Sequence, residues 1–309
     1  MIHTIESNPN IVTRRTDVRA AVSVRSEAEI ESIAKAGALV GEILEELRVR
    51  VRPGTTTAEL SSLAADLIEA ADADALPLSC VNENGDCFAH AICTSVDDVV
   101  LHGVPNHTPL VEGQIVSLDC SLRLEGWCAD SAITVAVGDV TPERSRLIET
   151  CEALLDTTID LVRPGVRWSR IARIMQELAL DAGFGVITDF GGHGIGRDIH
   201  EQPEVPSAVT PHLDAGGDFT LRPGMVVAIE PTLVLPGDIS GPARDRLGRA
   251  SGVPVAQGAD GWAVWTLDGA VAAHVEHTIA VGRTGARVLT RRPDPDMPRG
   301  VASGRGPQL

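Results

Sequence analysis

Acidic residues stand at the ends of short apolar runs in this 309-residue chain. Asp119 and Asp130 lie in "VSLDCSLRLEGWCADSAITVAV", which predicts two antiparallel strands with a turn near Glu125 and Gly126. Glu230 ends "MVVAIEP", and Glu276 interrupts "AAHVEHTIAV". Each acid alone is typical of a turn or a surface. Carboxylates brought together inside a sheet, however, repel each other and lose hydration, so the set favours a cation site.

One histidine adds a nitrogen ligand to these oxygens. His193 lies in "DFGGHGIGRDIHEQPEV" (189–205), seven residues before His200. Four acids and one imidazole suit a pair of divalent ions such as Mn(II), Co(II), Fe(II) or Zn(II) better than a closed zinc site of cysteines. Two such ions can share a hydroxide and polarise a carbonyl, which makes amide hydrolysis the natural candidate reaction. The ligands alone do not select the metal.

The same glycine-rich stretch is also similar to a dinucleotide-binding fingerprint. That motif needs a strand before it and a helix after it, so that phosphate meets the helix N-terminus. Here "RDIHEQPEVP" follows, with two prolines and no helical stripe. The sequence therefore argues against a phosphate-binding loop.

A repeat in the chain indicates how these residues are positioned. Capping boxes at Ser26 and Thr56 begin two amphipathic helices separated by "VRPG" (51–54). The same order returns from Thr141, with "VRPG" at 162–165. "LVEGQIVSLDC" and "LRPGMVVAIEP" match with the same offset of 111 residues. Turn chemistry alone could repeat in this way. The shared offset nevertheless favours a duplication, and predicts two α+β halves facing each other across a shared sheet.

Composition limits the partners. The chain has 43 acidic and 26 basic residues and a formal net charge of -17, which disfavours nucleic acid and anionic membranes. It has no apolar segment of membrane-spanning length and no apolar segment typical of a leader near its start. Six cysteines without a CxxC pair are more typical of reduced thiols than of disulfides. We therefore expect a cytoplasmic protein.

Five motifs in order resemble the type 1 methionine aminopeptidases. They are "CTSVDDVVLHGVP", the Asp119 and Asp130 pair, "GGHGIGRDIHEQP", "GMVVAIEP" and "DGWAVWTLDGAVAAHVEHTIAV". The resemblance covers roughly residues 22–290 and implies the α+β pita-bread fold, in which two pseudo-symmetric halves form a central curved antiparallel sheet flanked by helices. We expect 22–290 to be the catalytic domain, with 1–21 a disordered extension and 291–309 a flexible tail.

The resemblance also implies a role for each site residue. The ligands of two metal ions would be Asp119, Asp130, His193, Glu230 and Glu276, with Glu230 also the general base. His102 matches the family histidine that stabilises the tetrahedral centre, and His200 the one that contacts the scissile amide. The side-chain pocket would be lined by Phe88, Cys93 and Trp262.

Three positions depart from the family in the pocket region. Asn82 and Gly85 stand where a cysteine and aromatic rings are usual, and Ile199 replaces a common phenylalanine. Loss of ring area would weaken the binding of a methionine side chain. His274 stands where glutamine is common, and residues 235–259 form an insertion that we expect to be an exposed loop near the site mouth.

The sequence thus predicts a metal-dependent aminopeptidase that removes the initiator methionine from nascent proteins or peptides. An X-Pro or otherwise altered specificity on the same fold is one alternative. A non-catalytic binding protein is the other, although it would be expected to have lost metal ligands and none is lost here. We expect a monomer that acts on peptide N-termini; transient contact with the ribosome would fit that substrate.

Overall fold

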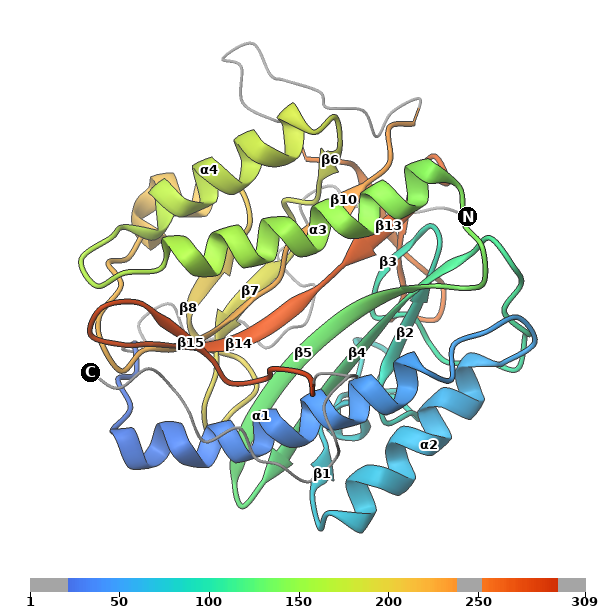
Figure 1. Ribbon diagram of the computed structural model, residues 1–309, viewed down its shortest axis with the longest axis horizontal. Helices are drawn as coiled ribbons and strands as arrows, with labels where there is room; N and C mark the ends of the chain where they lie inside the picture. The colour runs from blue at the N-terminus through green and yellow to red at the C-terminus, as the bar shows by residue number, and fades with distance from the viewer. Residues whose placement is uncertain (1–21, 238–251, 294–309) are drawn as a thin grey trace.

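Two pairs of helices cover one face of a central curved sheet (Figure 1). The computed structural model describes residues 22–237 and 252–293. The helices are α1 (Glu27–Arg48), α2 (Thr57–Ala70), α3 (Pro142–Leu161) and α4 (Trp168–Asp181). The predicted capping boxes at Ser26 and Thr56 are both formed, and Thr141 caps α3 ahead of Pro142. Local sequence therefore sets where these helices begin.

The central sheet has nine strands, and its neighbouring strands pair antiparallel. The main path runs β1-β4-β5-β14-β9-β7-β8, while β2 pairs with β4 and β15 pairs with β14. These strands are β1 (Asp74–Ala75), β2 (Cys93–Val96), β4 (Ile115–Leu124), β5 (Trp127–Ala136), β7 (Gly191–Gly194), β8 (Glu201–Pro206), β9 (Val226–Ile229), β14 (Glu276–Val281) and β15 (Ala286–Val288). The central pair β5 and β14 therefore joins segments far apart in the chain.

Two three-stranded sheets complete the part of the chain that the structure describes. One contains β13 (Ala272–His274), β10 (Thr232–Val234) and β6 (Gly185–Val186). The other contains β11 (Val255–Gln257), β12 (Val264–Thr266) and β3 (Val99–Leu101). Single helical turns lie at Pro77–Ser79 and Leu213–Gly217.

Backbone hydrogen bonds repeat with the offset seen in the sequence. The N–H of Gly54 donates to Leu110 O at 2.8 Å, and the N–H of Gly165 donates to Leu221 O at 2.9 Å. Both glycines have positive φ, 91° and 85°, a backbone conformation that favours glycine. Each pair of positions is 111 residues apart, so the structure confirms two halves built on one plan.

Alternation along the strands decides which side chains face the helices. Leu118, Cys120 and Leu122 of β4 pack with α1 and α2 in one core cluster. In the second half, Val227 and Ile229 of β9 pack against α3 and α4 in another. Because successive side chains on a strand point to opposite faces, the residues between these apolar positions face away from the helices.

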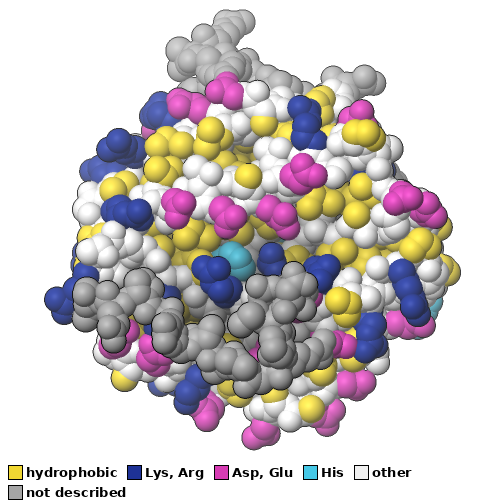
Figure 2. Space-filling model, in the orientation of Figure 1, with side chains coloured by type: hydrophobic (Ala, Val, Ile, Leu, Met, Phe, Trp, Pro, Cys, Tyr) yellow, Lys and Arg dark blue, Asp and Glu magenta, His cyan; other side chains and the backbone are white. Residues whose placement is uncertain are grey.

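The solvent face of the helix layer carries mixed charge. Figure 2 shows acidic side chains in a row over α3, where Glu152, Asp156 and Asp160 are exposed. None of the helices in residues 22–237 and 252–293 is apolar over the length that crossing a membrane requires.

The expectation for residues 235–259 is wrong for part of that insertion. Residues 238–251 lie outside the described part, but Val253 and Val255 are buried and β11 pairs with β12. These valines supply an apolar, β-branched run that forms a strand rather than an exposed loop. The expected extension, 1–21, also lies outside the described residues, as does the expected tail, 291–309, apart from residues 291–293.

Candidate metal centre

The four acids converge on the sheet face that points away from the helices. In the β4–β5 hairpin, Asp119 pairs with Ala132 and Ser121 pairs with Asp130, so the two aspartates are diagonal neighbours on one face. Glu276 begins β14 and also pairs with Ala132. Glu230 follows β9, whose Ile229 pairs with the residue after Glu276. Local strand geometry thus places carboxylates from both halves side by side.

His193 reaches the same cluster from β7. Its Nε2 lies 3.8 Å from Asp130 Oδ2, and its Nδ1 lies 3.0 Å from the carbonyl oxygen of Gly194. When Nδ1 donates to that carbonyl, the lone pair of Nε2 points to the acids. This hydrogen bond fixes the tautomer that a metal-binding histidine needs.

The glycines beside His193 allow close strand packing. A Cβ on Gly192 would lie 2.1 Å from Ala228 O, and one on Gly194 would lie 2.3 Å from Gln202 O. These glycines therefore let β7 approach β9 and β8, and in this way position His193.

The other two predicted histidines lie close by. The ring of His200 meets the ring of His193 edge to face, with centroids 4.3 Å apart. His102 follows β3 at a φ of 55° and packs edge to face on Phe190. Burial, then the neighbouring His193 and His102, hold the pKa of His200 well below its ordinary value, so this ring is neutral at pH 7.

The carboxyl groups are held in a strongly unfavourable environment for negative charge. Burial, then the charge of Asp119, raises the pKa of Glu230 to about 8. Burial raises the pKa of Asp119 to about 6, although a hydrogen bond with Asp130 opposes the shift. Burial, then other cluster acids, raises the pKa values of Asp130 and Glu276 well above their ordinary range. Such a cluster ionises fully only when a cation compensates it.

Unpaired buried atoms show that the residues fit a bound cation. Asp130 Oδ1, Glu276 Oε1 and both ring nitrogens of His274 are buried without a hydrogen-bond partner. Ligand atoms of Asp130, His193 and Glu276 lie within 4.8 Å of one another, as do those of Glu230, His274 and Glu276. The two groups share Glu276. Buried polar atoms rarely remain unpaired, and these are the oxygen and nitrogen donors that divalent metals prefer.

Two of the predicted pocket residues form an aromatic pair. Phe88 is 3% exposed and meets Trp262 edge to face with ring centroids 5.1 Å apart. Cys93 begins β2, where it pairs directly with Asp119. The structure therefore brings together two of the predicted pocket residues as an aromatic pair, and holds the third against the acids.

The departures in the pocket region have mainly structural roles. The Asn82 side chain accepts hydrogen bonds from the N–H groups of Asn84 and Asp86 and donates to Asp260 O at 3.1 Å. It thereby ties its loop to the segment that carries Trp262. Gly85 has a φ of 87° in the same turn. Ile199 packs on the cluster that contains Trp127 and residues of α1.

Sequence reasoning missed two neighbours of the site and undervalued a third. Burial, then the charges of Asp130 and Asp119, raises the pKa of the Cys80 thiol, so this cysteine borders the acids. Phe190 supports His102, and its place three residues before His193 was the available signal. His274 was noted only as a departure from the family.

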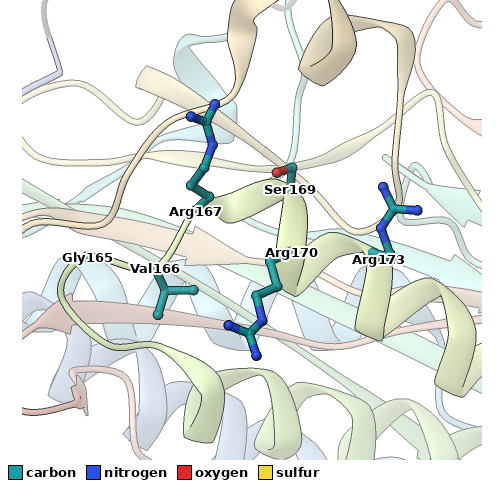
Figure 3. A pocket seen from close by; sticks show the side chains of 6 residues that line it. All are labelled: Gly165, Val166, Arg167, Ser169, Arg170 and Arg173. Atoms are coloured by element: carbon teal, nitrogen blue, oxygen red, sulfur yellow. The ribbon is translucent and has the colours of Figure 1, made fainter.

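A separate hollow of about 410 Å³ lies at the start of α4 (Figure 3). Its arginines, Arg167, Arg170 and Arg173, point in different directions. Arg167 Nε donates to Asp218 Oδ2 at 2.7 Å, and the Ser169 hydroxyl donates to the same oxygen. The hollow includes none of the acids or histidines described above, so it is separate from the candidate metal centre.

Comparison with known proteins agrees with this geometry. The model of Metallopeptidase family M24 matches residues 31–283. A methionine aminopeptidase of Aquifex aeolicus is 35% identical over 87% of this chain and 99% of its own length. One from Clostridium acetobutylicum is 36% identical over 87% of this chain and 98% of its own length.

Solved structures give the same result for the fold. The crystal structure of methionine aminopeptidase from Rickettsia prowazekii matches with a TM-score of 0.75 and 31% identity, covering 87% of this chain and all of that one. A prolidase from Pyrococcus horikoshii matches with a TM-score of 0.64 at 18% identity, over 88% of this chain and 64% of that one, and so shares the fold alone.

A curved sheet that gathers four carboxylates and a histidine between two related halves defines a metallopeptidase of the pita-bread fold, as the resemblance implied. The chain belongs to metallopeptidase family M24, and within it to the methionine aminopeptidases.

Proposed function

We propose that this chain removes methionine from peptide N-termini, using two divalent cations held by Asp119, Asp130, His193, Glu230 and Glu276. The observation that carries the proposal is the pair of ligand groups that share Glu276. These residues would hold the two cations, and the acids among them would compensate the cations' charge.

The bound ions would supply Lewis acidity, which makes a water molecule acidic and polarises the scissile carbonyl. Glu230 accepts the proton of that water at a carboxylate oxygen and returns it to the leaving amine. Without metal, burial raises the pKa of Glu230 to about 8, and bound cations would favour the ionised carboxylate that accepts a proton.

His200 and His102 act on the substrate as neutral imidazoles. A neutral ring donates one N–H. His200 lies beside His193, and His102 is near enough to lower the pKa of His200. Directed at the scissile amide and its developing oxyanion, these N–H groups stabilise charge that appears only in the transition state. Burial lowers the pKa of His102, which keeps this ring neutral as well.

The aromatic pair provides the apolar surface for the first side chain. Methionine is flexible, and its sulfur makes favourable contacts with aromatic ring edges. Phe88 and Trp262 present two rings at 75° to each other, and Cys93 lies beside Asp119. The free amine of the substrate, as a neutral nitrogen donor, would bind one of the cations, so a free N-terminus is selected over a blocked one.

The test uses metal-stripped protein reloaded with Co(II) or Mn(II). Three peptides distinguish methionine specificity, X-Pro specificity and a non-catalytic protein: Met-Ala-Ser, its Nα-acetylated form and an Ala-Pro peptide. We expect release of methionine from the first peptide alone. Preferred cleavage of the Ala-Pro peptide would replace methionine with X-Pro specificity. A metal-loaded protein that cleaves none of the three would refute the enzymatic function.

A further inference from the structure

His274 is a buried imidazole with no partner for its ring. The residue is 0% exposed, and neither Nδ1 nor Nε2 makes a hydrogen bond. Its backbone, in contrast, is firmly held: its N–H donates to Thr134 Oγ1 at 3.1 Å, and Thr134 Oγ1 donates to its carbonyl at 2.7 Å. A buried polar ring left unsatisfied is costly, so its environment indicates an absent partner.

The ring lies against the carboxylates. His274 Nε2 is 3.4 Å from Glu230 Oε1, and with Glu276 these residues form one of the two groups whose ligand atoms lie within 4.8 Å of one another. Glu276 Oε1 is also buried without a hydrogen-bond partner. One cation among the three side chains would provide a partner for His274 Nε2 and for Glu276 Oε1.

The internal repeat gives a second, independent reason. In the first half Ser121 pairs with Asp130, and in the second half Thr232 pairs with His274. Ser121 and Thr232 are 111 residues apart, which is the offset that relates the halves. His274 therefore occupies the place in the second half that Asp130, a proposed ligand, occupies in the first.

We propose that His274 is a metal ligand, binding through Nε2 one of the two cations together with Glu230 and Glu276. The centre would then carry two imidazoles, His193 and His274, one on each group that shares Glu276. This inference rests on the proposed function, because it assumes that the centre binds metal. An added imidazole shifts preference toward Co(II), Fe(II) and Zn(II) and away from Mn(II).

The experiment counts imidazoles by X-ray absorption of the Co(II)-loaded full chain and measures metal affinity by calorimetry. His274→Gln is the key variant, since the amide keeps a polar side chain beside Glu230 but does not replace the imidazole. His277→Gln is the matched control: this half-buried histidine is hydrogen-bonded through Nδ1 to Thr290 Oγ1 at 2.9 Å. Its strand neighbour Glu276 points to the opposite face.

We expect two imidazoles per two cobalt ions in the wild type and in His277→Gln, and one in His274→Gln. Loss of a residue that only supports a metal ligand typically lowers metal affinity roughly 10- to 100-fold. Loss of a direct ligand in His274→Gln should weaken Co(II) binding by at least that factor, and Mn(II) binding by less.

Two results would overturn the inference. A wild-type protein that binds two ions with a single imidazole would contradict it and leave the proposed function standing. A wild-type protein that binds no metal would contradict both the inference about His274 and the proposed function. The number of imidazoles bound to cobalt in the wild-type protein tests the inference even if the His274→Gln variant does not fold.

Discussion

Removing the charge of Glu230 should stabilise the metal-free protein at neutral pH. Its pKa rises from 4.5 to about 8 on folding, so the folded protein keeps a proton that the unfolded chain releases. The free energy of unfolding therefore falls as pH rises between these values. At pH 7 the loss from this group is roughly 3–3.5 kcal/mol, because pH 7 lies about 2.5 pH units above the ordinary pKa and each unit contributes about 1.4 kcal/mol.

Glu230→Gln keeps the shape of the side chain without this loss. Urea unfolding in excess chelator should show the variant more stable than the wild type by up to roughly 3–3.5 kcal/mol at pH 7, with little difference at pH 5. Glu177→Gln, a change on the exposed face of α4, should show no difference at either pH. A Glu230→Gln variant no more stable than the wild type at pH 7, or a gain equal at both pH values, would refute the reasoning.

Three further outcomes follow from the site. His193→Ala should lose metal and activity together, measured by bound metal and methionine release; an active variant would contradict the ligand assignment. Trp262→Ala removes the ring that contacts Phe88, and should raise KM for methionine peptides about tenfold or more at unchanged metal content. An unchanged KM would show that the methionine side chain of the substrate does not bind against this ring. Gly192→Ala forces a Cβ to within 2.1 Å of Ala228 O, and should lower stability by about 1–3 kcal/mol or more in thermal melts; a wild-type melting temperature would exclude that clash.

Local signals account for what the sequence predicted about the fold. Capping residues determine where helices begin, and both capping boxes form as expected. The Glu125–Gly126 turn sets the hairpin register, which brings Asp119 and Asp130 to one face. The repeat then predicts two halves, because related sequences form the same hydrogen bonds.

The contacts that individual side chains make could not be predicted in the same way. No spacing in the chain predicts that the rings of His193 and His200 meet at 4.3 Å, since a turn and a strand boundary separate them. Asn82 suggested a loss of ring area in the pocket, but its side chain satisfies backbone groups of its own turn. Short side chains that bond locally therefore resemble functional groups until their partners are seen.

The central claim is that this chain is a metal-dependent aminopeptidase. The most direct measurement is the release of free methionine from Met-Ala-Ser while metal-stripped protein is titrated with Co(II). We expect no release in chelator, and a rise in activity that is complete once the two proposed sites are filled. Full activity in chelator, or no release at any Co(II) concentration, would contradict the central claim.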